Sequence, residues 1–341
     1  MKNIYDYTYE MLEEYFVENN EKKFKVQQIY DWLYKKKVTS FFDMANIKKE
    51  LRDKLSNDIL FDMIKIVEIK KENNAIKYLF ELLDGNYIEA VLMFHNYGNS
   101  LCVSSQVGCN MGCKFCESGR LKKIRNLNTY EMVEQILLIE KEENIKISHV
   151  VLMGIGEPLD NYDNVINFVK IINHNKGLEI GARHITLSTC GVIPKIKLIS
   201  NLGLQVNLAI SLHAPNNEIR NKLMPINKIY DINELIKCLK EYIKITNRRV
   251  TFEYILLKNV NDSSKCAEDL AHLIRGMNCY VNIIPYNETN NIDYYRSDKN
   301  TIMNFYDILK KNKINVTIRQ EFGSNIDAAC GQLRSKKEGN L

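Results

Sequence analysis

The sequence has no run of about 18 uncharged apolar residues, the length that a helix needs to cross a bilayer. It also lacks a secretory signal, which starts with basic residues and continues with an apolar run, because its opening MKNIYDYTYEMLEEYF is acidic and amphipathic. No short-period repeat and no low-complexity segment interrupts the chain. We therefore expect a globular, cytoplasmic protein with no membrane partner.

A disulfide framework is missing as well. The nine cysteines are an odd number, and four of them fall within the fifteen residues from Cys102 to Cys116. In a reducing compartment, such a concentration of thiols more often binds metal or takes part in chemistry. The formal net charge of +5 permits a polyanionic partner but does not require one.

The first part of the chain predicts helices followed by short strands. Within residues 1–60, the stretches DYTYEMLEEYFVEN, FKVQQIYDWLYKKK and DMANIKKELRDKL carry apolar residues at helical spacing, which indicates a helical accessory domain. Residues 61–98 shorten to strand-like runs, with a turn at Asp84-Gly85-Asn86, and we interpret them as connecting β-strands. The accessory domain has eleven Lys/Arg and eleven Asp/Glu, so an RNA-binding face there requires segregation of charge.

From residue 99 onward, short β-rich runs alternate with amphipathic helical stretches. The predicted strands are SLCVSS, HVVLM, HITLS, NLAIS, VTFEYIL and YVNIIPY, with NVTIR after the last long helix. Repeated βα units favour parallel strands with right-handed crossovers, and six such units make a partial barrel rather than a closed one. We assign residues 99–300 to this α/β partial barrel and residues 301–341 to a C-terminal helix, strand and cysteine-bearing segment.

Cys109, Cys113 and Cys116 follow the first barrel strand at the spacing C-x3-C-x2-C, beside glycines that let the backbone bend tightly. Three thiolates are one fewer than the four that saturate a structural zinc or a ferredoxin-type cluster, so one coordination position stays open. An open position is what a catalytic metal centre needs. The alternative is a structural zinc that a distant His or Cys completes.

The C-x3-C-x2-C spacing ahead of a βα repeat resembles the radical S-adenosylmethionine (SAM) superfamily. The resemblance implies one 4Fe-4S cluster held by the three cysteines, with SAM chelated to the iron that has no protein ligand. MGIGEP, residues 153–158, is similar to the superfamily's glycine-rich motif. The resemblance then implies that Gly156 and Glu157 meet the amino group of SAM.

Further motifs resemble the RlmN/Cfr family, the radical SAM enzymes that methylate an adenosine carbon in large-subunit ribosomal RNA. They occur in the family's order over nearly the whole chain: LCVSSQVGC, RNLNTYEMV, GEPLDNYDNV, LSTCGVIPKI, LAISLHAPNNEIR, MPINKIY, VNIIPYN and NIDAACGQLR. This resemblance implies further SAM-binding positions at strand ends, namely Ser188, Ser211, Leu212, His213 and Asn287. Outside that context, Ser211 and His213 would be a satisfied polar pair at a strand end.

The family resemblance also gives roles to two cysteines and a carboxylate. It implies that Cys330 carries a methyl group as S-methylcysteine, that Cys102 is the second mechanistic cysteine, and that Glu89 is an acid/base group. Without the resemblance, the two cysteines would be inert buried thiols and Glu89 an exposed strand residue. The remaining cysteines match no motif that needs a thiol, and we interpret them as packing residues: Cys190, Cys238, Cys266 and Cys279.

The chemistry that the resemblance implies uses two SAM molecules per turnover. One SAM methylates Cys330 by displacement, and the second is cleaved reductively to a radical that removes hydrogen from the S-methyl group. The resulting methylene radical adds to the adenine carbon. Cys102 then takes the ring proton and attacks the Cys330 sulfur, which releases methylated RNA and leaves a transient disulfide. An external electron donor and a thiol reductant complete the cycle.

The sequence favours the carbon-2 branch of the family. GEPLDN, STCG and SLHAP are similar to the RlmN type, which acts on carbon 2 of an adenosine in 23S rRNA and also on some tRNAs. The phenylalanine in QEFGSNIDAACGQL leans toward the Cfr type, which methylates carbon 8 and confers antibiotic resistance. The run CESGRLKKIRNL departs from the family pattern through Glu117, Lys122 and Lys123. Two other readings stay open: an RNA-binding protein with a structural metal, and a different radical SAM enzyme that does not need Cys330.

Overall fold

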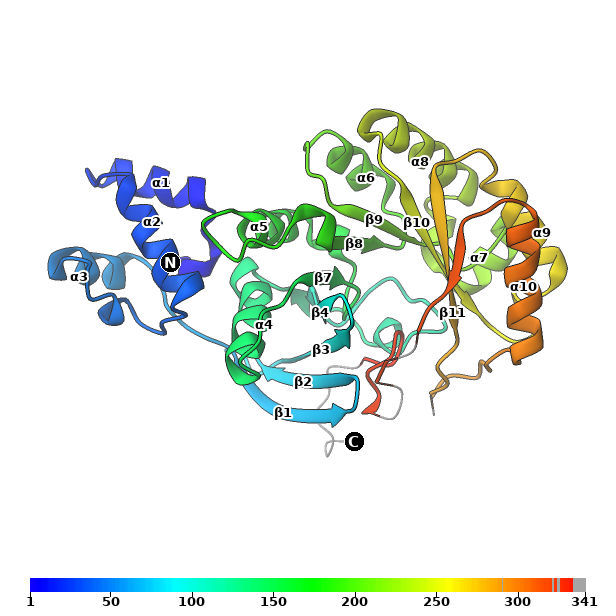
Figure 1. The fold of residues 1–341 in the computed structure, drawn as a ribbon, viewed down its shortest axis with the longest axis horizontal. Helices are drawn as coiled ribbons and strands as arrows, with labels where there is room; N and C mark the ends of the chain where they lie inside the picture. The colour runs from blue at the N-terminus through cyan, green and yellow to red at the C-terminus, as the bar shows by residue number, and fades with distance from the viewer. Residues whose placement is uncertain (290, 321, 324–325, 334–341) are drawn as a thin grey trace.

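The computed structural model describes residues 1–289, 291–320, 322–323 and 326–333. At one end of the molecule, short helices form a separate lobe in Figure 1. They are η1 (Ile4–Asp6), α1 (Tyr9–Glu18), α2 (Phe24–Tyr30), which continues into the π-helical η2 (Asp31–Lys35), η3 (Phe41–Asp43) and α3 (Lys49–Asp58). The helical periodicity of residues 1–60 is confirmed, and its apolar positions, such as Leu12, Phe16 and Leu55, are fully buried.

An antiparallel meander follows the helical lobe. Its strands are β1 (Lys65–Glu72), β2 (Ala75–Glu81), β3 (Tyr87–His95) and β4 (Gly98–Cys102), each paired with the next. The turn between β2 and β3 lies at the predicted Asp84-Gly85-Asn86, where Gly85 has a left-handed φ of 78°. These strands belong to the same sheet as the barrel strands, so the meander extends the barrel wall.

The barrel itself is parallel. Beyond β4 come β7 (His149–Leu152), β8 (Ile185–Thr189), β9 (Asn207–Ser211), β10 (Val250–Leu256), β11 (Cys279–Pro285) and β12 (Val316–Ile318). Every neighbouring pair from β4 to β12 runs parallel in chain order. Within the described residues the sheet has ten strands, with β1 and β12 as its edges, so the wall stays open as predicted. The strand after the last long helix joins the wall as β12.

Helices cover the outer face of this wall (Figure 1). They are α4 (Thr129–Glu142), α5 (Tyr162–Asn173), α6 (Ile193–Ser200), α7 (Asn217–Leu223), α8 (Ile232–Thr246), α9 (Ser264–Leu273) and α10 (Lys299–Lys311). Helix α8 illustrates why they form where they do. The Asp231 carboxylate caps its first turn, Leu235 and Leu239 are buried on one face, and Asn247 ends it in a left-handed conformation.

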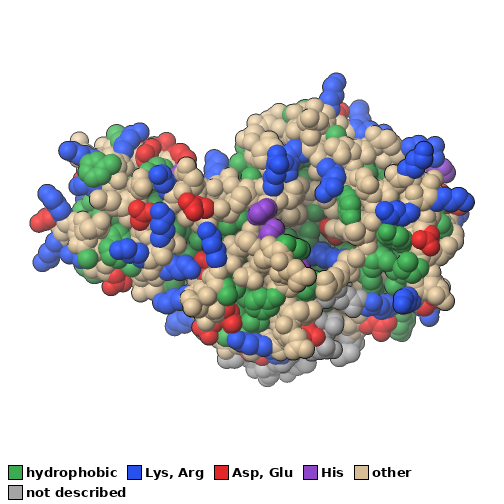
Figure 2. Space-filling view, in the orientation of Figure 1, with side chains coloured by type: hydrophobic (Ala, Val, Ile, Leu, Met, Phe, Trp, Pro, Cys, Tyr) green, Lys and Arg blue, Asp and Glu red, His purple; other side chains and the backbone are tan. Residues whose placement is uncertain are grey.

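Short elements complete the connections. The 3-10 helices η4 (Ser118–Arg120), η5 (Pro158–Asn161), η6 (Ala182–His184) and η7 (Pro225–Lys228) lie in loops, and β5 (Gln106–Val107) pairs with β6 (Arg125–Asn126). No described helix is both long enough and apolar enough to span a bilayer. On the face drawn in Figure 2, Lys and Arg side chains are scattered over both the helical lobe and the barrel.

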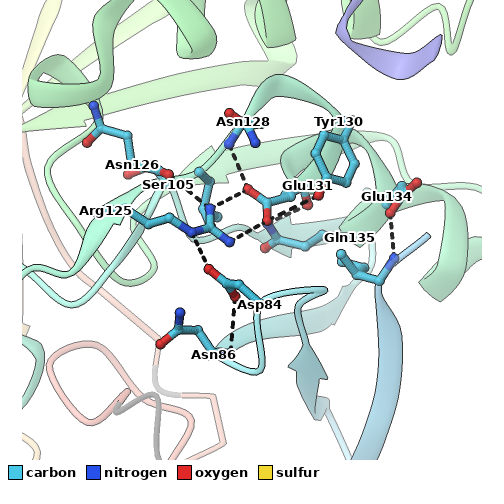
Figure 3. A network of polar contacts seen from close by, with 12 residues as sticks. Asp84, Asn86, Ser105, Arg125, Asn126, Asn128, Tyr130, Glu131, Glu134 and Gln135 are labelled. Carbon is cyan, nitrogen blue, oxygen red and sulfur yellow. Dashed lines mark hydrogen bonds and ion pairs between the residues drawn. The ribbon is translucent and has the colours of Figure 1, made fainter. Parts of the chain in front are cut away.

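A polar network fastens the meander to the start of α4 (Figure 3). The Arg125 guanidinium forms two hydrogen bonds to the fully buried Glu131 carboxylate, at 2.7 and 2.8 Å, and one to Asp84 at 2.6 Å. In the same view, Glu134 accepts the Ile64 N–H at 2.8 Å, where the helical lobe leads into β1. The network therefore links the segment after the helical lobe, the meander and the barrel. The division into four domains stays a prediction.

Candidate active site at the carboxyl ends of the barrel strands

The three cysteines of the C-x3-C-x2-C motif line one cavity at the carboxyl ends of the barrel strands. It has a volume of about 150 Å³, and we call it the cluster cavity after the cluster that the motif predicts. Its wall also includes most of the other predicted site residues, namely Gly156, Glu157, Ser188, Ser211, His213 and Cys330. Residues that are more than two hundred positions apart in the sequence are thus brought to one place, as strand ends of a parallel barrel allow.

The cysteine loop is closed by two glycines. Gly108 has a left-handed φ of 74°, and a side chain there would overlap the Lys122 carbonyl. A Cβ on Gly119 would lie 2.6 Å from the Cys113 carbonyl oxygen. Both positions therefore exclude a side chain, which explains why glycine flanks the cysteines on both sides.

The three thiols are electrostatic neighbours. Burial raises the pKa of Cys109 to about 12 and raises the pKa values of Cys113 and Cys116 as well. Cys116 and Cys109 raise the pKa of Cys113 further, since neighbouring thiolates repel. Among the described residues, no three His, Cys, Asp or Glu side chains converge on a single-ion geometry. The set of three sulfur donors around a cavity fits a cluster whose thiolates bind different irons.

Arg220 is a buried cation beside this loop that sequence reasoning missed. Its guanidinium is fully buried and donates to the carbonyls of Leu212, Cys190 and Ser211 at 2.6–3.3 Å, and to the Asn227 amide oxygen at 2.9 Å. None of the carboxylates in the described part of the chain forms an ion pair with it. A buried, unpaired cation is expensive, and an anionic cluster next to it would offset that cost. The available signal was the arginine in the quoted LAISLHAPNNEIR motif.

The glycine-rich motif at the end of β7 packs against the chain just before the cysteine loop. A Cβ on Gly154 would lie 2.6 Å from the Val103 carbonyl oxygen, and one on Gly156 would lie 2.6 Å from the Gln106 side chain. The Glu157 carboxylate accepts the N–H groups of Leu159 and Cys190 at 3.0 and 2.8 Å. Burial raises the pKa of Glu157, and these hydrogen bonds partly counter it. The carboxylate is thus fixed in the cavity wall.

His213 is held in an unusual conformation at the end of β9. It has a left-handed φ of 55°, its ring packs edge-on against Phe115 of the cysteine loop, and its Nδ1 accepts the Ile255 N–H at 3.1 Å. That bond leaves Nε2 as the protonated nitrogen. Burial, helped by Arg220, lowers the pKa of His213 to about 3. A neutral imidazole can therefore donate one hydrogen bond to a ligand.

Two predicted SAM-binding residues do not line this cavity, and their role stays a prediction. The Leu212 side chain is fully buried in the main core, and its backbone N–H and carbonyl are already bonded to Glu253 and Arg220. Asn287 lines a second, smaller cavity of about 40 Å³, on the far side of Cys330. The geometry therefore does not group Leu212 and Asn287 with the other residues of the cluster cavity.

The second cavity brings together the two cysteines that are predicted to act in the mechanism. Cys102 and Cys330 both line it, both are free thiols, and Cys330 also lines the cluster cavity. Burial, and next the neighbouring Cys330, raises the pKa of Cys102 to about 12. Arg319, at the end of β12, lies on the walls of both cavities, and its pKa is raised first by Cys330 and also by Glu253 and Cys102. Sequence reasoning assigned no role to this cation.

Glu89 is not exposed, so the prediction of an exposed strand residue, made without the family resemblance, was wrong. It is only 4% exposed and lies 3.3 Å from the Lys77 ammonium, which is buried too. In the register of the meander, Val91 pairs with both Lys77 and Cys102, so Glu89 shares a face with these residues. Lys77 also donates to the Asp327 carbonyl at 3.3 Å. A lysine at an inward position of the apolar strand AIKYLFE was the signal for this pair.

The segment that carries Cys330 is tied to the cysteine loop. Ser118 Oγ donates to the Leu333 carbonyl at 2.7 Å, and the Glu117 N–H donates to the Gly331 carbonyl at 2.8 Å. Glu117, one of the three departures from the family pattern, is buried here, whereas Lys123 forms an ion pair with Asp160 and Lys122 is exposed. The departure at Glu117 therefore lies next to Cys116, the third cysteine of the motif.

The four cysteines expected to be packing residues are all buried. Cys238, Cys266 and Cys279 belong to the main core, as expected. Cys190 packs beside the cysteine loop and also lines the cluster cavity, so it is closer to the site than its local sequence indicated.

Comparisons with known proteins agree with this geometry. The model of the radical SAM superfamily matches residues 103–273, and that of the ribosomal RNA large subunit methyltransferase N-terminal domain matches residues 2–60. A probable dual-specificity RNA methyltransferase RlmN of Acholeplasma laidlawii is 53% identical over 98% of this chain and 99% of its own length. Its counterpart from Enterococcus faecalis is 52% identical over 98% of this chain and 97% of its own.

A solved structure is similar over nearly the full chain. The crystal structure of a radical SAM methyltransferase from Sphaerobacter thermophilus is 39% identical, has a TM-score of 0.93, and covers 98% of this chain and 100% of that one. The expected fold class, a partial barrel behind an N-terminal helical region, is confirmed by this likeness and by the sheet topology. The cysteine-lined cavity and the pair of free thiols beside it agree with these full-length relatives. The chain therefore belongs to the RlmN family of radical SAM RNA methyltransferases.

Proposed function

We propose that this enzyme transfers a methyl group to carbon 2 of an adenosine in 23S rRNA and of an adenosine in some tRNAs. The observation that carries the proposal is the position of Cys330, which lines both the cluster cavity and the cavity of Cys102. A methyl group on the Cys330 sulfur would face the SAM site on one side and the resolving thiol on the other. The names of the relatives, dual-specificity RNA methyltransferases, favour two RNA classes.

The residues of the cluster cavity divide into two groups by chemistry. Cys109, Cys113 and Cys116 would hold one 4Fe-4S cluster, with Arg220 as the buried counter-charge. Glu157 and His213 would orient SAM, the first as acceptor for its amino group and the second as a neutral donor. When bound, the cluster and SAM supply the radical that removes hydrogen from the methyl group on Cys330. The small volume of this cavity, about 150 Å³, would leave little room for water or competing reactants once the cluster and SAM are bound.

The two cysteines would act in sequence. The Cys330 sulfur accepts a methyl group from one SAM and later presents it to adenine as a methylene bridge. The adduct formed by radical addition must lose one electron, which the cluster would take back. Cys102 takes the proton from the ring carbon and then attacks the Cys330 sulfur. The sulfur–carbon bond breaks, its electron pair stays on the carbon, and that carbon takes a proton to become the methyl group. The Cys102–Cys330 disulfide that remains needs two electrons from a thiol reductant, and reductive cleavage of SAM needs an external one-electron donor.

Glu89 and Lys77 would assist Cys102 and Cys330. Their ion pair lies on the same face of the meander as Cys102, and Lys77 also holds the backbone near Cys330. As an acid/base group, Glu89 would exchange a proton with Cys102 rather than with the RNA, because it does not line either cavity. A cytoplasmic setting, with soluble reductants, suits this chemistry.

The carbon-2 assignment is tested by the product. Ribosomal RNA and tRNA from cells that lack the enzyme, after incubation with the reconstituted protein, SAM and a low-potential reductant, should yield 2-methyladenosine on digestion. Chromatography with mass spectrometry against both methyladenosine standards decides the position. Finding only 8-methyladenosine would reverse the assignment in favour of the Cfr type.

A further inference from the structure

A third cavity opens at the opposite end of the barrel. It has a volume of about 950 Å³ and is lined by residues at the amino ends of the strands, among them Arg183 before β8, Asn207 at the start of β9 and Arg249 before β10. It shares Met153 and Arg319 with both the cluster cavity and the cavity of Cys102 and Cys330. The three cavities therefore adjoin one another inside the barrel, with Cys330 at the inner end.

Three of the residues that line this mouth, Phe322, His95 and Tyr97, carry aromatic rings. The row continues beside the mouth through His149 and His184, and we call the five rings the ring ladder. Neighbouring rings are in contact. The His149 and His184 rings are stacked with centroids 4.2 Å apart, and the His95 and Tyr97 rings are stacked at 4.5 Å. Tyr97 meets His149 edge-on at 5.1 Å, and His95 meets Phe322 edge-on at 4.6 Å.

The ladder is accessible to solvent at its outer rings, and burial lowers the pKa values of its inner histidines. Tyr97 is 66% exposed and His184 is exposed, although large aromatic side chains usually find burial. Burial, followed by Arg319, lowers the pKa of His95, and burial, His184 and His95 lower that of His149. Figure 2 shows histidine side chains beside a hollow on this face of the barrel, with Lys and Arg side chains around it.

Cations without acidic partners line the same mouth. Arg183, Arg248 and Arg249 form no ion pair with any carboxylate in the described part of the chain. Asn207 and Gln205 orient the Arg248 guanidinium at 2.8 and 3.3 Å, and the Arg249 guanidinium lies 4.9 Å from the Tyr280 ring centre. Arginines that are oriented but not neutralised suit phosphate groups.

We propose that this mouth binds single-stranded nucleotides next to the target adenosine, with the ring ladder stacking their bases and the arginines holding their phosphates. Aromatic rings bind any base through its π-face, and arginines bind the backbone, so the combination fits unpaired RNA rather than a duplex. The target base would leave its stack and pass inward toward Cys330. The inference rests on the proposed function and adds where the substrate enters and which residues hold it.

The test uses the reconstituted enzyme and an RNA stem-loop with an unpaired adenosine in its loop. Replacing the base on either side of that adenosine by 2-aminopurine reports stacking as quenched fluorescence, and anisotropy at several salt concentrations gives affinity. We expect Tyr97→Leu and His184→Ala to relieve the quenching and weaken binding by about fivefold to a hundredfold, without changing the salt dependence. Arg249→Ala should instead flatten the salt dependence by about one phosphate contact.

Matched variants separate stacking from other effects. Tyr97→Phe and His184→Phe keep a ring at each position and should bind as the unchanged enzyme does. His272→Ala removes an exposed histidine from the outer helix α9 and should have no effect. Methylation of Cys330 by SAM, read as added mass on the protein without RNA, reports whether each variant is folded.

The outcomes distinguish this inference from the proposed function. If the unchanged enzyme binds and methylates the stem-loop while Tyr97→Leu and His184→Ala bind equally well, the ring ladder does not hold RNA. Equal loss of binding in His272→Ala would also overturn the inference. If the unchanged enzyme gives no methylated RNA at all, the proposed function fails, and the inference that rests on it fails too.

Discussion

The backbone N–H of Glu117 donates to the carbonyl of Gly331 at 2.8 Å, which joins the residue after the third cluster cysteine to the residue after Cys330. A second bond, from Ser118 Oγ to the Leu333 carbonyl at 2.7 Å, reinforces the connection. Cys330, the proposed methyl carrier, is thus positioned by contacts with the cysteine loop. Its position relative to the SAM site depends on contacts between two segments that lie far apart in the sequence.

The connection predicts a selective defect in Ser118→Ala. Losing one buried hydrogen bond costs about 1 kcal/mol, enough to loosen the segment around Cys330 without unfolding the barrel. We expect slower methylation of Cys330, measured by mass spectrometry of the protein, together with unchanged iron content. Ser56→Ala removes a comparable serine-to-carbonyl bond in α3, far from the site, and should leave the rate unaltered. Equal rates in both variants would contradict the role of the connection.

The buried pair of Lys77 and Glu89 predicts strong coupling in stability. Removing one partner leaves the other charge buried and unpaired, which costs about 3–5 kcal/mol of stability. Replacing both partners by apolar residues of similar size costs much less. Denaturant unfolding should therefore be measured for Lys77→Met, Glu89→Leu and the double variant. The double variant should lose less unfolding free energy than the two single variants lose together. Additive effects would mean that the ion pair at 3.3 Å is not coupled in solution.

The buried Arg220 guanidinium predicts that cluster binding depends on its positive charge. Arg220→Met removes the charge and leaves carbonyls of strand ends β8 and β9 without their donor. We expect it to bind much less iron and sulfide on anaerobic reconstitution than the unchanged protein, with Arg220→Lys intermediate because it keeps the charge but not the planar fork. Circular dichroism before reconstitution checks folding. A folded Arg220→Met protein with full iron content would rule out this role.

The Asp84–Arg125 contact predicts a pH-dependent contribution to stability. The Arg125 guanidinium lowers the pKa of Asp84 to about 2, from about 3.9 in an unfolded chain. Because the folded value is the lower one, the contribution is present above about pH 4 and is lost as the pH falls toward 2. The difference in unfolding free energy between the unchanged protein and Asp84→Asn should shrink from pH 6 to pH 3. Asp307→Asn, on the exposed face of α10, serves as control. A difference that stays constant over this range would contradict the assignment.

Much of this arrangement could be predicted from local sequence patterns. The strand and helix periods, the turn at Asp84-Gly85-Asn86 and the open parallel wall follow from spacing alone. The cysteine loop and the glycine-rich motif were predictable because each is short and contiguous. The match of Cys102 with Cys330 came from family resemblance, since more than two hundred residues separate them.

The residues that sequence reasoning missed act through tertiary contacts. Arg220 donates to three strand-end carbonyls and an amide oxygen, and no local pattern reveals these acceptors. Lys77 on β2 forms an ion pair with Glu89 on the adjacent antiparallel strand β3. Arg319 lies near Cys102 and Cys330 because it follows β12, which pairs with β11. Leu212 was predicted at the site from its motif, and its side chain, one residue past the end of β9, lies in the core. Burial and charge partners depend on register, which the one-dimensional pattern does not specify.

The central claim is that Cys330 delivers the methyl carbon and Cys102 releases the product. It is tested most directly by incubating Cys102→Ala and Cys330→Ala with RNA, SAM and a low-potential reductant, and by running the products on a denaturing gel. Cys102→Ala should accumulate a slow-migrating protein–RNA adduct that collapses on nuclease treatment, because the carbon–sulfur link to Cys330 forms and cannot be resolved. Cys330→Ala should give neither adduct nor methylated RNA. Normal turnover by Cys102→Ala, or an adduct with Cys330→Ala, would contradict the two-cysteine account.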